Sequence, residues 1–189
     1  MGRLTFGMMT SLDGYINDLH GGFDWGQVSE QVHRFAEAEE AAVAVNIYGR
    51  RMFETMKIWD TVFVDQSVSQ FERDYSLIWR RTEKIVVSRT LSEVTTSNTR
   101  LVRELSAEDI ADLKAGTDKD IAVSGPTLAC AFLRQGLIDE VSIYYIPVAV
   151  GTGTPMFQVQ NLVRLERRQV EVFGNGVVFM RFGVLRQDA

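Results

Sequence analysis

Short apolar runs typical of buried strands alternate with segments of helical periodicity along the first two thirds of the chain. Strands are predicted at residues 3–9, 43–48, 84–88 and 120–124. Helices are predicted at residues 29–42, 50–57, 70–81, 107–115 and 127–135. Strands that alternate with helices form mostly parallel sheets, because each helix returns the chain across the sheet. The sequence therefore predicts an α/β fold.

The last third of the chain has a different pattern. A strand predicted at residues 140–146 leads into a glycine-rich loop, and two strand-like segments at 163–173 and 177–186 flank Gly174-Asn175-Gly176. An Asn-Gly pair favours the tight turn that joins antiparallel strands. We therefore expect an antiparallel C-terminal hairpin beside the mostly parallel sheet.

No linker or repeat interrupts the chain, and the polar stretches at residues 60–70 and 93–99 are predicted to be loops. With 189 residues, 46% hydrophobic and 24% charged, the composition is that of an ordinary globular protein. We expect one domain that spans residues 1–189.

Charge and cysteine content exclude several classes of function. A net charge of −5 gives no broad basic surface for nucleic acid, although a few arginines can still bind a small anion. Cys130 is the only cysteine, so a disulfide within the chain and a thiolate zinc site are excluded, and its apolar helical context predicts burial. No run approaches the roughly 18 apolar residues that span a bilayer, and no signal-peptide layout is visible. We expect a cytoplasmic protein with no metal and no membrane partner.

The segment Ser124-Gly125-Pro126-Thr127-Leu128 marks a junction where an apolar strand breaks at a glycine and restarts as a helix. Pro126 suits the first helical position, because its missing N–H would have no partner there. Backbone N–H groups at a helix N-terminus favour an anion such as a pyrophosphate. The alternative reading is a simple strand-to-helix turn.

Two further junctions repeat this arrangement. Gly49 ends a strand and is followed by Arg50 and Arg51 at a helix start, where cations are unfavourable for the helix dipole unless an external anion neutralises them. Ser88 and Arg89 end another strand. Ligands of open α/β sheets bind beyond the carboxyl ends of parallel strands, so the three junctions are predicted to share one crevice. A solvated arginine pair is the alternative for Arg50 and Arg51.

None of these junctions is a Rossmann fingerprint. That motif requires G-x-G-x-x-G at the first strand-to-helix turn. Neither G-x-G of the chain fits, because Gly151-Thr152-Gly153 is late and is followed by Thr154-Pro155, and Gly174-Asn175-Gly176 is the predicted hairpin turn. A Rossmann dehydrogenase is therefore disfavoured.

Two more segments carry glycine-marked patterns, S-x-D-G-x-I at residues 11–16 and P-x-x-x-G-x-G-x-x-x-F at residues 147–157. Together with the three junctions they resemble the dihydrofolate reductase-like superfamily. The resemblance is closest to the C-terminal reductase domain of the bifunctional riboflavin-biosynthesis deaminase/reductase, the RibD C-terminal domain, and covers nearly the whole chain. Met52 and Ser124 depart from the family pattern, which has Thr and Gly at these positions.

The resemblance implies a dihydrofolate reductase-like three-layer fold and an oxidoreductase that transfers hydride from NADPH to a small heterocyclic (pterin or pyrimidine) or ribosylamino substrate. The implied cofactor-binding residues lie at the three junctions: Gly49, Arg50, Arg51, Ser88, Arg89, Ser124, Gly125, Pro126, Thr127 and Leu128. Those expected beside the substrate are Thr10, Asp13, Tyr15, Trp25, Gly151 and Gly153. The resemblance and the apolar C-terminal strands also imply a homodimer.

Asp13 is the candidate catalytic residue, either as a proton donor with a raised pKa or as an acceptor for the N–H groups of a heterocycle. An Asp-Gly turn without catalytic role is the alternative. Trp25 follows Gly21-Gly22 and is either a lid over the substrate or packed core.

A second class of function remains open, a nucleotide-binding or interaction protein that keeps the fold without turnover. Met52 and Ser124 favour it, because one removes a hydroxyl donor and the other adds a side chain at the cofactor junctions.

Overall fold

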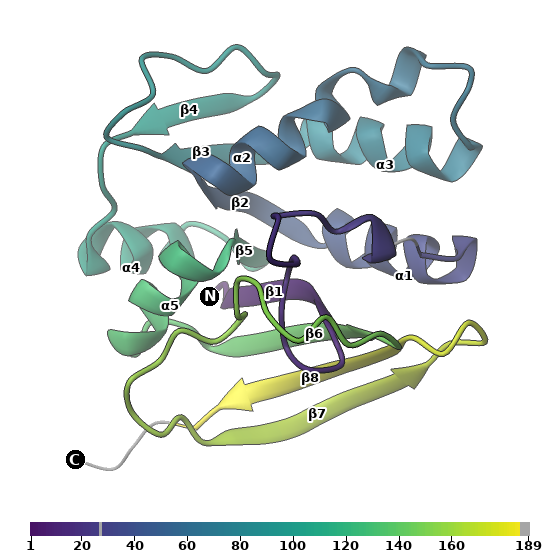
Figure 1. Ribbon diagram of the computed structural model, residues 1–189. Helices are drawn as coiled ribbons and strands as arrows, with labels where there is room; N and C mark the ends of the chain where they lie inside the picture. The colour runs from purple at the N-terminus through teal and green to yellow at the C-terminus, as the bar shows by residue number, and fades with distance from the viewer. Residues whose placement is uncertain (27, 186–189) are drawn as a thin grey trace.

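The computed structural model describes residues 1–26 and 28–185, and its centre is one eight-stranded sheet (Figure 1). The strands are β1 Leu4–Ser11, β2 Val43–Gly49, β3 Glu83–Val87, β4 Thr99–Val102, β5 Asp120–Ser124, β6 Glu140–Ile146, β7 Leu165–Val172 and β8 Val178–Val184. The helices are α1 Glu30–Ala41, α2 Arg50–Met56, α3 Gln70–Arg81, α4 Ala107–Ala115 and α5 Pro126–Arg134. Short 3₁₀ turns occur at η1 Asp24–Gly26, η2 Lys57–Asp60 and η3 Val62–Val64.

The strand order across the sheet is β4-β3-β2-β5-β1-β6-β8-β7. The pairings from β4 to β6 are all parallel, whereas β8 is antiparallel to both β6 and β7. The turn at residues 174–176 joins β7 to β8, with Gly176 at a φ of 86°. The mostly parallel sheet with an antiparallel C-terminal hairpin is therefore confirmed.

Helices cover both faces of this sheet. Ile47 packs with Ile110 of α4 and Phe132 of α5, whereas its neighbour Tyr48 packs with Trp79 of α3. Adjacent residues of a strand point to opposite faces, so α3 lies on the face opposite α4 and α5. The fold thus has three layers. Among the described residues, no helix combines the length and apolar content needed to cross a bilayer.

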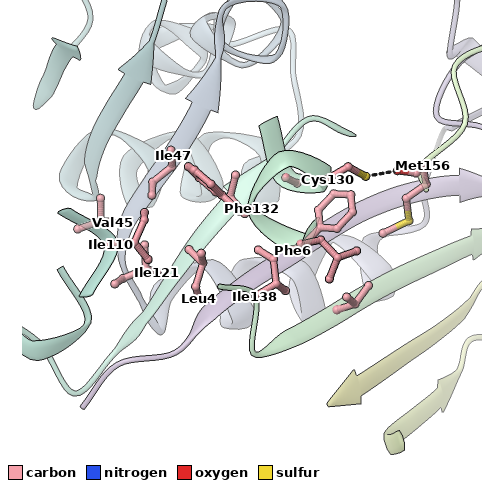
Figure 2. Close-up of a cluster of buried hydrophobic side chains, with 14 of the residues drawn as sticks. Leu4, Phe6, Val45, Ile47, Ile110, Ile121, Cys130, Phe132, Ile138 and Met156 are labelled. Atoms are coloured by element: carbon pink, nitrogen blue, oxygen red, sulfur yellow. Dashed lines mark hydrogen bonds between the residues drawn. The ribbon is translucent and has the colours of Figure 1, made fainter. Parts of the chain in front are cut away.

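Figure 2 shows the largest buried cluster, in which strand residues such as Leu4 and Phe6 meet the apolar side of α5. Cys130 is fully buried there, as predicted. Its thiol donates a hydrogen bond to the Met156 carbonyl at 3.4 Å and accepts one from the Gln158 N–H at 3.2 Å. The thiol therefore fastens α5 to the segment that follows β6.

Two predicted loops contain regular structure. Residues 93–99 were expected to be a loop, but Thr99 begins β4, which extends the sheet beyond β3 by parallel pairing. The stretch at 60–70 contains η3. The last strand was predicted to reach Arg186; β8 ends at Val184, and Arg186 lies outside the described residues.

Lys84 is fully buried in β3 although its side chain ends in an ammonium group. Its Nζ donates hydrogen bonds of 2.6 Å to the carbonyls of both Trp79 and Thr82 at the end of α3. Burial lowers the pKa of Lys84 from 10.5 to about 8, because the charged form loses hydration. The lysine therefore joins α3 to β3 at an electrostatic cost.

This cost predicts an alkaline gain in stability. Between pH values of about 8 and 10.5 the unfolded chain holds a proton on Lys84 that the folded chain releases, so the free energy of unfolding rises with pH through this group. We expect the difference in unfolding free energy between wild type and Lys84→Met to increase from pH 8 to pH 10 in urea titrations. Lys119→Met is the control for removal of an exposed lysine, and a constant difference for Lys84→Met would contradict the assignment.

Candidate functional site

The register of the sheet brings the three predicted junctions together. Gly49 at the end of β2 is opposite Val87 of β3, directly before Ser88. Tyr48 of β2 is opposite Ser124 of β5. A Cβ placed on Gly49 would lie 3.8 Å from the Cβ of Leu128. The carboxyl ends of β3, β2 and β5 thus form one continuous edge.

The two helices that begin at this edge start on glycine. Gly49 precedes α2 and Gly125 precedes α5, and neither provides a side-chain cap. By contrast, Ser29, Ser69 and Ser106 cap α1, α3 and α4 through their hydroxyl groups. In the part of the chain that the structure describes, the first N–H groups of α2 and α5 are therefore not capped by a side chain and can bind an anion.

Gly125 adopts a φ of 98°, which favours glycine. Its N–H donates to the Met8 sulfur of β1 at 3.4 Å. A Cβ on residue 125 would lie only 3.1 Å from the Cβ of Met52. Pro126, directly after it, is buried at the first position of α5, whereas Thr127 is exposed. The junction thus has space for backbone approach only because residue 125 has no side chain.

The arginines at this edge differ in how they are held. Arg50 Nε donates to Glu54 at 2.8 Å, and Arg50 Nη1 donates to the Thr90 hydroxyl at 3.0 Å. Arg89 is highly exposed and lies 3.7 Å from a Glu104 carboxylate oxygen. Within the described residues Arg51 makes no ion pair. Arg51 and Arg89 are therefore the cations most available to a ligand.

The two segments expected beside the substrate are joined along their backbones, and the loops after β1 and β6 lie side by side in Figure 1. Residues 12–16 exchange hydrogen bonds with residues 148–156, and Tyr15 forms an antiparallel bridge with Pro155. A Cβ on Gly153 would overlap the Asn17 carbonyl oxygen at 1.9 Å. Gly153 therefore lets the two segments touch.

Asp13 holds this pair of segments. Its carboxylate accepts the N–H of Val150 at 3.2 Å and the N–H of Gly151 at 2.8 Å. Hydrogen bonds from Ser11 and from the Gly151 amide lower the pKa of Asp13 below its ordinary value. A proton donor at neutral pH needs the opposite shift, so these contacts favour the acceptor role among the two roles expected for Asp13.

Among the described residues, the Thr10 hydroxyl and the Trp25 indole N–H are buried and have no hydrogen-bond partner. Thr10 is 1% exposed at the end of β1. Trp25 lies in η1 and packs against the cluster of Val32 and Phe179, in agreement with the packed alternative. Buried polar groups are usually paired, so these two atoms are candidates for contacts with a ligand.

Sequence reasoning missed three residues that shape this edge. Met8 binds the Gly125 N–H, Thr90 binds Arg50, and Arg103 donates to the carbonyls of Ser88 and Leu91. The position of Thr90 directly after Ser88-Arg89 was an available signal. No sequence pattern indicated a role for Met8 or Arg103, because their contacts depend on strand pairing.

A hollow of about 520 Å³ lies at the opposite, amino-terminal edge of the sheet. Glu83, Asp109 and Asp112 are among its lining residues. Carboxylates repel a diphosphate, and α2 and α5 begin at the other edge. We therefore exclude this hollow from the candidate site.

The family follows from comparison with known proteins. The model of the RibD C-terminal domain family matches residues 3–179, so the chain belongs to this family. The family match supports an oxidoreductase-type role related to riboflavin biosynthesis. A curated relative, the uncharacterized protein YyaP of Bacillus subtilis (strain 168), is 26% identical over 178 residues, which are 93% of this chain and 92% of that protein.

Solved structures share the fold at low identity. A putative riboflavin biosynthesis protein from Shewanella sp. PV-4 has a TM-score of 0.76 and 24% identity, with 98% of this chain and 100% of that chain covered. A pyrimidine reductase-like protein from Corynebacterium diphtheriae has a TM-score of 0.65 and 14% identity, with 98% and 93% covered. RibD from Acinetobacter baumannii has a TM-score of 0.70 and 17% identity; 98% of this chain matches 58% of that one. The dihydrofolate reductase-like fold is thereby confirmed.

The Gly125 junction yields a prediction about both stability and binding. Gly125→Ala should lower the free energy of unfolding by about 1–3 kcal/mol for the positive φ alone, and contact with Met52 adds to this. It should also weaken dinucleotide binding, because the added methyl group stands in the turn. Chemical denaturation and cofactor titration measure the two effects.

Gly136→Ala is the matched control for this substitution. Gly136 has a φ of 70°, and a Cβ there would meet nothing within 4 Å. It should lose stability from backbone strain and keep full dinucleotide binding. Equal behaviour of the two variants in the titration would contradict the assignment of Gly125 to the site.

Proposed function

We propose that this protein is an NADPH-dependent reductase that transfers hydride to a small heterocyclic substrate, a pterin or pyrimidine, or to a ribosylamino compound. One observation carries the proposal. Paired strands β2 and β5 end side by side, and each leads through an uncapped glycine into a helix. Such an edge provides backbone donors for a diphosphate.

The residues at this edge fit a phosphorylated dinucleotide. N–H groups at the starts of α2 and α5 suit the diphosphate, with Ser124, Thr127 and Leu128 along the same turn. Arg51 and Arg89 suit the 2′-phosphate that distinguishes NADPH from NADH, because guanidinium groups bind phosphate through several donors. Ser88 directly follows β3, at the part of this edge where the adenosine of the cofactor would bind.

The bound nicotinamide supplies the hydride, and the protein aligns and encloses the reactants. Within the described residues the Thr10 hydroxyl and the Trp25 indole N–H have no partner, and a substrate that displaces the side chains covering them would gain both as donors. The joined segments carrying Asp13, Tyr15, Gly151 and Gly153 form one wall at the same edge. Asp13 fixes that wall as an ionised acceptor and offers further lone pairs to the N–H groups of a heterocycle.

The substrate class is proposed from the relatives. The Corynebacterium diphtheriae structure is described as pyrimidine reductase-like, and the Shewanella structure as a putative riboflavin biosynthesis protein. Both descriptions are compatible with a reducible nitrogen heterocycle or its ribosylamino derivative. The loops at residues 12–25 and 148–158 follow β1 and β6, and they determine which compound of this class is bound.

Met52 favours a second candidate, a nucleotide-binding protein without turnover. Its side chain packs against the Gly125 turn and offers no hydroxyl to phosphate. Substrate screening separates the two candidates. Loss of nicotinamide absorbance with a pterin, a pyrimidine or a ribosylaminopyrimidine supports the reductase, whereas saturable NADPH binding with no oxidation by any of them supports the second candidate.

The arginines give a cofactor prediction. Arg51→Ala combined with Arg89→Ala should raise the dissociation constant of NADPH about a hundredfold or more, since each of the two charge-assisted contacts contributes about 1.5–3 kcal/mol. NADH binding should change much less, because NADH lacks the 2′-phosphate. Calorimetric titration of both cofactors measures this.

Arg81→Ala provides the control, because Arg81 is an exposed arginine at the end of α3, at the opposite edge of the sheet. It should leave both cofactors unaffected. Equal loss of NADPH and NADH in the double variant would argue against a 2′-phosphate contact.

We also propose a homodimer formed through the apolar face of the C-terminal hairpin. Val170 and Val172 of the edge strand β7 are 37% and 72% exposed. They pair with Met180 and Val178 of β8, so the four side chains share one face. An exposed apolar face on an edge strand is a common site of self-association.

The dimer predicts a shift in mass on charge insertion. Val170→Lys with Val172→Lys should convert a dimer to a monomer in sedimentation equilibrium, because lysines on a shared face repel across a twofold axis. Val64→Lys, at an exposed apolar residue of η3, should leave the mass unchanged. A monomeric wild type would contradict the proposal.

The remaining parts of the proposal concern context. Residues 1–189 would act as one reductase domain in the cytoplasm, with no nucleic-acid partner, no membrane partner and no metal. The net charge of −5 and the single buried cysteine support this assignment.

A further inference from the structure

A tight turn at residues 88–91 follows β3. The Ser88 hydroxyl accepts the N–H of Thr90 at 3.3 Å and the N–H of Leu91 at 3.1 Å. Ser88 itself is only 6% exposed. The serine therefore closes the turn from inside by bonding to the backbone ahead of it.

Arg103 closes the same turn from outside. It directly follows β4, whose last residue Val102 pairs with Val87 and accepts the Ser88 N–H at 3.0 Å. Arg103 Nη1 donates to the Ser88 carbonyl at 2.9 Å and to the Leu91 carbonyl at 2.6 Å. One guanidinium nitrogen thus joins the first and last residues of the turn.

The turn between these two carbonyls carries groups that the proposed cofactor site uses. Arg89 projects from it as an exposed cation, 3.7 Å from the carboxylate of Glu104. Thr90 accepts a hydrogen bond from Arg50, which ties the turn to the start of α2. The position of the turn therefore fixes both Arg89 and the partner of Arg50.

We infer that Arg103 is a positioning residue that holds the 88–91 turn and so sets the preference for NADPH over NADH. This inference rests on the proposed function. Arg103 does not itself bind the cofactor; it restricts the turn, so that less conformational freedom is lost when the Arg89 guanidinium binds the 2′-phosphate. Preorganisation of this kind raises the affinity for the 2′-phosphate that Arg89 contacts, and it leaves the binding of the rest of the dinucleotide unchanged.

Arginine suits this position better than lysine. Two N–H bonds of one planar nitrogen can reach two carbonyls at a fixed angle, whereas an ammonium group on a flexible stem holds two acceptors less rigidly. Arg103→Lys should therefore rescue part of the function that Arg103→Met removes.

The test compares Arg103→Met, Arg103→Lys and the control Arg100→Met in the full chain. Arg100 is an exposed arginine on the same strand, β4, where its Nε binds Glu83 at 3.1 Å, away from the turn. The dissociation constants of NADPH, NADH and adenosine 2′,5′-bisphosphate are measured by calorimetry. Hydrogen exchange of the Thr90 and Leu91 amides is measured in the free protein.

We expect Arg103→Met to weaken NADPH and the bisphosphate about tenfold and NADH less than about twofold. The Thr90 and Leu91 amides should exchange faster, because opening of the turn becomes easier. Arg103→Lys should be intermediate on every measure, and Arg100→Met should match wild type.

Three results would overturn the inference. These are equal weakening of NADPH and NADH, unchanged binding of both, or unchanged exchange of the turn amides in Arg103→Met. If wild type binds neither dinucleotide, the proposed function fails and the inference with it. Binding by wild type with an unaltered NADPH to NADH ratio in the variants would remove the inference alone.

Discussion

The parallel register of β3, β2, β5, β1 and β6 is the constraint on which the rest of the structure depends. Parallel strands place all their carboxyl ends at one edge; the pairing of Tyr48 with Ser124 aligns the ends of β2 and β5, and that of Ser11 with Ile146 aligns the ends of β1 and β6. β1 continues past the end of β5, because Phe6 is already opposite Val123. The residues that directly follow these strand ends therefore lie at the same edge of the sheet. The helix starts, the arginines and the two substrate-side loops meet there for this reason.

Most of this sheet could be predicted from the sequence, because β2, β5 and β6 are short, mainly apolar runs that end at a glycine, a serine or a proline-containing loop. β4 could not. It has four residues, and Arg100 in its middle is exposed, so its pattern does not differ from a polar loop. Lys84 shows the opposite difficulty, since a lysine in a strand usually marks an exposed position, whereas here two carbonyls at the end of α3 hold it inside.

Part of the candidate site could likewise be predicted from the sequence, and part could not. Glycine-punctuated strand ends are local patterns, so the junctions at Gly49 and Gly125 could be located in advance. The contacts of Asp13 with Val150 and Gly151 join residues far apart in the chain, so no local sequence pattern predicts them. For the same reason the sequence left the role of Asp13 open between proton donor and acceptor, whereas hydrogen bonds from Ser11 and from the Gly151 amide of a distant loop lower its pKa.

The central claim is that strand ends at the carboxyl edge bind the phosphates of the cofactor, and backbone amide shifts measured by NMR during an NADPH titration test it most directly. The account predicts that the largest shifts fall on Gly49, Arg51, Arg89, Gly125 and Thr127, while Glu83 and Asp112 at the opposite edge stay unchanged. Shifts concentrated around Glu83 and Asp112, or no shifts at saturating NADPH, would contradict it.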